Sequence, residues 1–178
     1  CLQTEGQSVY EHGISIKNHT IQLINILQTN IIPDTWKIPD WVIYYRLHIL
    51  NNLLPLNVIE EYTLFHDIGK PYCLILDSDG NRHFPNHAEL SGLKWLELDG
   101  DPQVAKLISM DMDIHLLKSI DIDKWIEHPE AITLLIVGLS EIHANAKLFG
   151  GINSVSFKIK YKQIDRKGKS ICQKLFGD

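Results

Sequence analysis

Cysteine is scarce in this chain, with three in 178 residues, at Cys1, Cys73 and Cys172. Their odd number and wide spacing exclude a disulfide framework, and no Cys-x-x-Cys pair is present. Proteins without a disulfide framework are typical of reducing compartments. The sequence therefore predicts a cytoplasmic location.

Long apolar runs are also missing. The longest uncharged apolar stretch, at 131–139, has about nine residues, whereas a helix needs about 20 to span a bilayer. No basic segment followed by an apolar one opens the chain, so we expect no secretory signal peptide and no membrane partner. Repeats, low-complexity tracts and linkers are absent from the sequence as well. With 44% apolar and 22% charged residues, the composition predicts a single folded domain over 1–178.

Positive charge is concentrated at the end of the chain. From Ser156 onward there are seven basic and two acidic residues, whereas the preceding part has ten basic and twenty acidic ones. Such a basic segment predicts either contacts with the phosphates of a nucleic acid or a solvated amphipathic helix. We favour the helix, because Phe157 and Tyr161, which could stack on bases, belong to a predicted buried stripe.

That stripe decides the secondary structure of the C-terminal segment. Alternation of apolar and basic residues over 157–162 is typical of a strand. Over a longer window, however, apolar or small residues recur at intervals of four and three: Phe157, Tyr161, Ile164, Gly168, Ile171 and Leu175. This spacing predicts a basic helix over 154–176, with Gly168 at a close contact.

The rest of the chain has the periodicity of helices. Asp40 is a plausible N-cap of one helix, and Asp101 followed by Pro102 begins another. Short strands at 72–76 and 82–84 flank a turn at 79–81 and predict one small hairpin. The predicted class is all-α, a helical bundle with a single β-hairpin. Its helices are expected at about 8–28, 40–52, 57–66, 86–98, 102–118 and 129–149.

An adjacent imidazole and carboxylate, His66 and Asp67, end one of the apolar helices. The dipeptide alone is common by chance, but nine histidines are many for this length. Four imidazoles and two carboxylates together suit one or two divalent transition-metal ions, Mn, Fe, Co, Ni or Zn, with Mg also possible. Asp67 could bridge two ions, which an imidazole cannot do. The candidate ligands are His12, His66, Asp67, His87, His115 and Glu141.

The segment His66-Asp67-Ile68-Gly69-Lys70-Pro71, with the later Phe84-Pro85-Asn86-His87, resembles the HD-domain metal-dependent phosphohydrolase superfamily. Within it, the chain most resembles the HD domain of bacterial CCA-adding tRNA nucleotidyltransferases. The resemblance implies an all-helical fold and a mono- or dinuclear metal centre. It places metal ligands at His12, His66, Asp67, His87 and His115.

The last ligand of that family is usually an aspartate, and here the matching position holds Glu141. A glutamate can still bind a metal, but its longer side chain shifts the ion. His143 or Asp111 could take its place. Structural alternatives also exist, since Glu141 could pair with Lys147 or Lys70, and His115 could be a core histidine bonded to Asp111.

Lys70 follows the His-Asp pair within one helical turn. Its ammonium could bind a phosphate and stabilise the negative charge that develops there, as a catalytic and substrate-binding group. Alternatively, it is a helix C-terminal lysine that complements the helix dipole. Arg82, on the predicted hairpin, is a second candidate for phosphate binding.

The function implied by the resemblance is hydrolysis of a phosphate ester, in which a metal-activated hydroxide attacks phosphorus. We expect a phosphomonoesterase or phosphodiesterase that acts on nucleotides or nucleic-acid ends. The substrate could be a 2′,3′-cyclic phosphate, a phosphomonoester or a nucleoside triphosphate. The alternative is a catalytically degenerate HD domain that serves as a nucleotide- or RNA-binding module, with Glu141 marking the lost chemistry.

Overall fold

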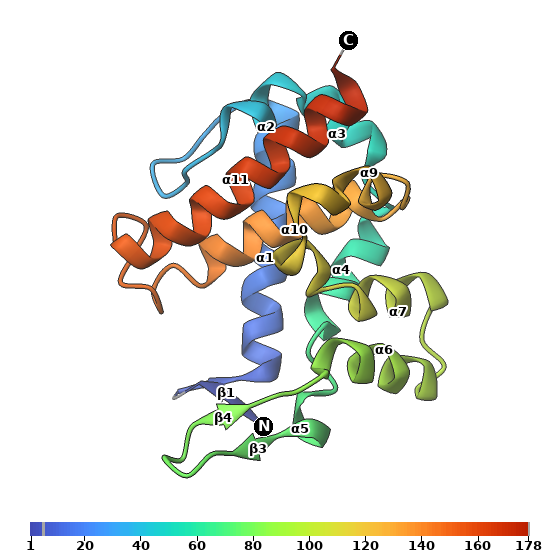
Figure 1. Ribbon diagram of the computed structural model, residues 1–178, viewed down its shortest axis with the longest axis vertical. Coiled ribbons are helices and arrows are strands. Elements are labelled where there is room, and N and C mark those ends of the chain that lie inside the picture. The colour runs from blue at the N-terminus through green and yellow to red at the C-terminus, as the bar shows by residue number, and fades with distance from the viewer. Residues whose placement is uncertain (5, 178) are drawn as a thin grey trace. The chain divides into compact units, whose positions relative to one another are not determined.

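Helices dominate the computed structural model, which describes residues 1–4 and 6–177, and two small antiparallel hairpins accompany them (Figure 1). The predicted all-α class with a hairpin after the His-Asp pair is confirmed. The chain divides into two compact units. Unit 1 comprises Cys1–Lys17 and Pro55–Asp113, and unit 2 comprises Asn18–Leu54 and Ile114–Asp178. A single domain over the whole chain stays a prediction.

Unit 1 is organised around two helices that bury apolar faces against each other. Helix α7 packs against both α4 and α6, and its Val104, Leu107 and Ile108 are fully buried. Asp101 caps α7 as predicted, because its carboxylate accepts from the backbone N–H of Gln103 at 2.6 Å. The unit contains β1 (Leu2–Thr4), β2 (Gln7–Ser8), the start of α1 (Val9–Thr29), α4 (Leu56–Phe65), α5 (Lys70–Cys73), β3 (Ile75–Leu76), β4 (Arg82–His83), α6 (His87–Glu97) and α7 (Pro102–Ser109).

The predicted hairpin is β3–β4, in which Ile75 pairs with His83. Its turn is held by the Asp77 carboxylate, which accepts from the backbone N–H groups of Asp79 and Asn81 and lies 2.8 Å from Nε2 of His83. The first strand starts later than predicted, because residues 70–73 form a helical turn instead. The second hairpin, β1–β2, was not predicted from the sequence.

Unit 2 has α10 as its buried centre. This helix packs against α3 and α11, and all but two of its residues, Glu141 and Ala144, are buried. Within the described residues, no helix combines the length and apolar character that crossing a lipid bilayer requires. Besides the rest of α1 and most of α8 (Asp113–Leu116), the unit contains α2 (Asp40–Tyr44), α3 (Arg46–Asn52), η1 (Ser119–Asp121), α9 (Ile122–Trp125), α10 (Ala131–Ala144) and α11 (Val155–Phe176).

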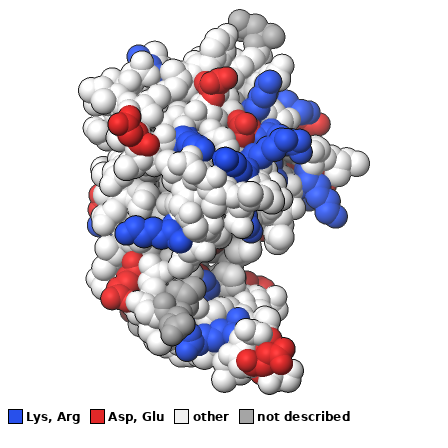
Figure 2. Space-filling model, turned by 90° about the vertical axis from the view of Figure 1, so that its left-hand side faces the viewer, with Lys and Arg blue, Asp and Glu red and all other residues white. Residues whose placement is uncertain are grey.

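The C-terminal segment is the predicted helix, α11, rather than a strand. Ser154 caps it by accepting from the backbone N–H of Phe157. Gly168 lies at a close contact, because a Cβ there would be 2.2 Å from Cζ2 of Trp41. Six of the seven basic residues of α11 are exposed, and Figure 2 shows Lys and Arg side chains in blue gathered on part of the surface. The exposed ones are Lys158, Lys160, Lys162, Arg166, Lys169 and Lys174.

Three predicted helix boundaries were wrong. The helix predicted over 40–52 is interrupted at Tyr45, and its N-cap is Pro39 rather than Asp40. The helix predicted over 102–118 ends at Ser109, and the chain then turns so that buried Asp111 accepts from the hydroxyl of Tyr62 at 2.6 Å. The helix predicted over 129–149 is limited to 131–144. No Gly or Pro marks the first two breaks, so local sequence gave no signal for them.

Candidate metal centre

The pair His66 and Asp67 lies directly after the last residue of α4, inside unit 1. Both side chains are buried, with 3% and 2% of their surface exposed. Nε2 of His66 lies 3.1 Å from Oδ2 of Asp67. Because both groups are polar and withdrawn from water, they need partners within the protein or a bound ion.

His12 joins this pair because α1 approaches the end of α4 very closely. A Cβ at Gly13 would lie 2.1 Å from the carbonyl oxygen of Leu64, so a residue without a side chain is needed there. The preceding residue, His12, is 1% exposed, and its Nε2 lies 3.8 Å from Oδ2 of Asp67. Its ring centroid is 5.3 Å from that of His66.

The three side chains form a group that could hold a metal ion. One ligand atom from each of His12, His66 and Asp67 lies within 4.8 Å of the other two. Two donors bound at about 2.1 Å to neighbouring positions of one ion lie roughly 3.0–3.4 Å apart. The 3.1 Å separation of His66 from the carboxylate lies in this range, and the 3.8 Å separation of His12 exceeds it by about 0.4 Å.

The orientation of two imidazoles also favours a cation. Nδ1 of His66 lies 2.9 Å from the carbonyl oxygen of Thr63, and Nδ1 of His87 lies 2.9 Å from that of Phe84. A carbonyl only accepts, so each Nδ1 carries the hydrogen, and Nε2 of a neutral ring is an acceptor. These two Nε2 atoms face the acceptor oxygens of Asp67 at 3.1 and 3.6 Å. Acceptors that face each other at this range need a metal ion or an additional proton between them. Metal-binding histidines commonly donate their other N–H to a carbonyl in this way.

Asp67 lies next to a positive charge, the ammonium of Lys70. Burial alone would raise its pKa, but His66 and the Lys70 ammonium outweigh this and hold the pKa well below its usual range. Nζ of Lys70 donates to Oδ2 at 2.6 Å and lies over the ring of Phe84, 5.3 Å from the centroid. Oδ1 is buried and accepts no hydrogen bond within the described residues. One carboxylate oxygen is thus left for a further cation.

His87 completes the group at its more accessible side. It is the first residue of α6, and its side chain is 17% exposed. The start of α6 is held beside Asp67, because the backbone N–H of Gly69 donates to Oγ of Ser91 at 2.8 Å. Unit 1 therefore brings together five of the predicted site residues: His12, His66, Asp67, Lys70 and His87. Arg82 is exposed on β4 of the same unit.

His115 and Glu141 belong to unit 2, where they contact each other. Nε2 of His115 lies 2.8 Å from Oε2 of Glu141, and both side chains are partly exposed. The half-buried Lys167 ammonium donates to the carbonyls of Ile114 and His115 at 2.9 and 2.6 Å. Burial lowers the pKa of Lys167. Metal binding by His115 and Glu141 stays a prediction.

The substitute ligand His143 has a different role. Nδ1 lies 2.9 Å from the carbonyl oxygen of Leu139, Nε2 accepts from the backbone N–H of Lys37 at 3.2 Å, and the ring stacks on Trp36. Burial lowers its pKa to about 4, so it is neutral at pH 7. Both ring nitrogens are therefore committed to the backbone. The other substitute, Asp111, accepts from Tyr62 as described above.

Sequence patterns gave no signal for the groups that orient the centre. The carbonyls of Thr63 and Phe84 are backbone atoms, and Gly13 and Ser91 belong to no motif. Thr63 and Phe84 share one sequence feature, because each lies three residues before the histidine that its carbonyl contacts. This spacing alone does not indicate the contact. No protein-family model, curated protein or solved structure matches the chain, so these comparisons assign no family.

Proposed function

We propose that the protein is a metal-dependent phosphohydrolase of the HD type that acts on nucleotides or nucleic-acid ends. The observation that carries the proposal is the buried group of His12, His66 and Asp67, in which one ligand atom of each residue lies within 4.8 Å of the other two. The resemblance of the segment 66–71 to HD-domain enzymes supports the same activity.

His12, His66 and Asp67 would hold the first ion, and His87 is placed to contribute from the rim. A nitrogen and oxygen donor set of this kind suits Mn, Fe, Co, Ni or Zn. When bound, such an ion activates water and polarises a phosphoryl oxygen. Within unit 2, we propose His115, with Glu141 as an additional candidate, as ligands of a second ion.

The chain's own residues would position the phosphate. Lys70 carries a buried ammonium beside Asp67, where it can neutralise charge on a phosphoryl oxygen during attack. Arg82 is exposed on the hairpin and can bind an outer phosphate through its planar guanidinium. The carbonyls of Thr63 and Phe84 keep the imidazoles of His66 and His87 in the tautomer that binds metals through Nε2.

One observation favours a second candidate function. The ammonium of Lys70 already donates to Oδ2 of Asp67 at 2.6 Å, which neutralises the carboxylate as a bound ion would. A degenerate HD domain stabilised by this ion pair would bind a nucleotide or RNA without hydrolysing it. In that case Lys70 would be a structural residue.

Hydrolysis assays separate the two functions. Bis-p-nitrophenyl phosphate, 2′,3′-cyclic AMP and nucleoside triphosphates would be tested with Mn²⁺, Ni²⁺ or Co²⁺, and bound metal would be measured by elemental analysis. We expect turnover and bound metal for the parent protein and loss of both for Asp67→Asn. Asp99→Asn is the matched control, because it makes the same change at an exposed position of unit 1. Nucleotide binding without turnover under any metal would favour the degenerate module, and absence of bound metal would contradict the proposed centre.

A further inference from the structure

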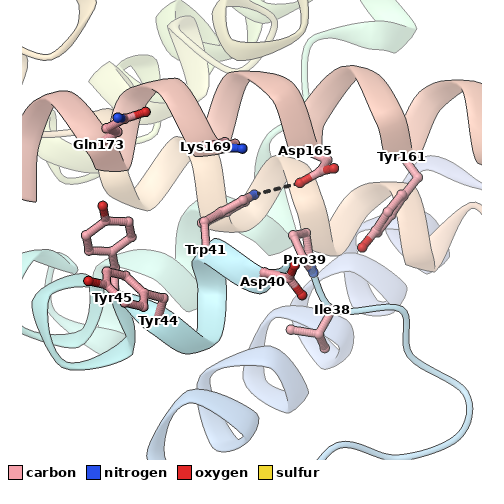
Figure 3. Close-up of a pocket in the computed structure, with 10 residues that line it drawn as sticks. All are labelled: Ile38, Pro39, Asp40, Trp41, Tyr44, Tyr45, Tyr161, Asp165, Lys169 and Gln173. Atoms are coloured by element: carbon pink, nitrogen blue, oxygen red, sulfur yellow. Dashed lines mark hydrogen bonds between the residues drawn. The ribbon is translucent and has the colours of Figure 1, made fainter. Parts of the chain in front are cut away.

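A groove in unit 2 runs along α11, on the side that faces α2 (Figure 3). Its volume is about 570 Å³. Tyr161, Asp165 and Lys169 line it at intervals of four residues, which places them on one face of α11. Asp40 and Trp41 line it from α2. All of these residues belong to the same unit, and none belongs to the candidate metal centre.

The groove holds more negative than positive charge. The carboxylates of Asp40 and Asp165 both line it, against a single ammonium, that of Lys169. The indole N–H of Trp41 donates to Oδ1 of Asp165 at 3.1 Å, which fixes that carboxylate against the wall of the groove. Within the described residues, neither Asp40 nor Lys169 forms an ion pair. Two carboxylates therefore face the groove without a cation of the chain bound between them.

Aromatic rings form much of the remaining wall. Tyr161, Trp41 and Tyr45 all line the groove, and ring faces attract cations more strongly where water is partly excluded. Burial, together with Asp165 and Asp40, raises the pKa of Tyr161 to about 12, so its phenol stays neutral.

We propose that this groove binds an alkylammonium group, which would lie between the carboxylates of Asp40 and Asp165 and against the rings of Tyr161 and Trp41. A phosphate or carboxylate would meet two like charges there, so the groove is distinct in its chemistry from the phosphate site proposed for unit 1. The ammonium can belong to a free polyamine or to a lysine side chain of a partner protein. Lys169 acts as an internal competitor, because its own ammonium reaches the same wall.

The indole N–H resonance of Trp41 in a heteronuclear NMR spectrum provides the test. Spermidine would be titrated in one arm, a short peptide of alternating lysine and glycine in a second arm, and adenosine monophosphate in a third, all at constant ionic strength. We expect a saturable shift of Trp41 with a cationic probe while Trp95, in unit 1, stays unchanged. Tighter binding of spermidine would identify a free amine as the ligand, and tighter binding of the peptide would identify a partner protein.

Single substitutions in the groove should raise or lower its affinity for the cation in predictable directions. Asp165→Asn keeps an acceptor for the indole but removes the charge, so affinity for the cation should fall about tenfold. Lys169→Gln should raise it about threefold, because the internal competitor is lost. Asp34→Asn, an exposed carboxylate of unit 2 outside the groove, should leave it unchanged. Absence of a saturable shift with both cationic probes would overturn the proposal. So would a shift with adenosine monophosphate that Lys169→Gln abolishes.

Discussion

At the position of Asp67, a metal ion bound at the proposed centre would compete with Lys70 for the same carboxylate oxygen. Nζ of Lys70 donates to Oδ2, which is also the oxygen closest to the imidazoles of His12 and His66. Removing the ammonium would free Oδ2 for the metal and so favour metal binding. It would also remove a positive charge that the proposed reaction needs, and so lower turnover. The two effects have opposite signs, and this distinguishes a catalytic lysine from a structural one.

We predict that Lys70→Gln retains or tightens metal binding while turnover falls by about a hundredfold. Calorimetric titration with Mn²⁺ measures the first effect, and steady-state kinetics with bis-p-nitrophenyl phosphate measures the second. Lys94→Gln is the matched control, because Lys94 pairs with Glu97 on the outside of α6. If Lys70→Gln lost metal and activity together with the fold, the lysine would be structural.

The buried histidine at 143 should make unit 2 sensitive to acid. Its folded-state pKa of about 4 lies below the ordinary value of 6.5, so between these pH values the unfolded chain binds more protons than the folded one. The free energy of unfolding should therefore fall as pH drops from 6.5 to 4, by at most about 3 kcal/mol. Urea denaturation across this range measures the slope. His143→Gln should flatten it, whereas His48→Gln, at an exposed histidine of the same unit, serves as the control. An unchanged slope in His143→Gln would contradict the prediction.

At the scale of the helices, the contact of α1 with α4 positions His12. Gly13→Ala would force its new Cβ against the backbone carbonyl of Leu64, which cannot move away like a flexible side chain. We expect a loss of about 2 kcal/mol in the free energy of unfolding and a metal affinity at least about tenfold weaker. Urea denaturation and metal titration measure these effects. Asn18→Ala, at an exposed position of the same helix, should change neither. A Gly13→Ala variant with normal metal affinity would mean that α1 does not position the ligand.

The helices show how far local sequence predicts this fold. Periodicity placed α1, α4, α6 and α11 within a few residues, because each has a sustained apolar stripe. It failed at Tyr45 and after Ser109, where helices are interrupted without a Gly or Pro. The turn at Asp111 is stabilised by a buried hydrogen bond from the hydroxyl of Tyr62. Tyr62 lies 49 positions away in the sequence, so a pattern read over one helix length does not include it.

At the scale of the whole molecule, the site residues are spread over distant parts of the sequence. Recognisable motifs identified His66 and Asp67, and the fold brings His12 and His87 to within 3.8 and 3.6 Å of that carboxylate. What sequence could not predict is which residues share a unit, because this depends on how separate segments pack. His115, from unit 2, is the clearest example.

Metal should stabilise the folded chain as a whole. An ion bound by segments from α1 and from the end of α4 favours the folded state by about 2.7 kcal/mol at a concentration one hundred times its dissociation constant. We therefore expect Mn²⁺ to raise the melting temperature of the parent protein by several degrees and to leave that of Asp67→Asn unchanged. Scanning calorimetry measures the shift, and Trp95 reports on unit 1 because its ring stacks on Phe65, the neighbour of His66. An equal rise in Asp67→Asn would place the stabilising ion elsewhere.

The burial of α10 has a consequence for how the sequence can vary. Its buried Ser140 and Thr133 have hydrogen-bond partners, since Ser140 donates to the carbonyl of Ile136 within the helix and Thr133 accepts from the backbone N–H of Leu54, 79 positions away. A saturation mutagenesis map should accordingly show an unbroken block of intolerant positions over 131–140. Along α11, by contrast, tolerance should rise and fall with each helical turn, with its minima at Phe157, Ile164 and Ile171. The two helices pack against each other, yet tolerance to substitution should be uniformly low along α10 and periodic along α11.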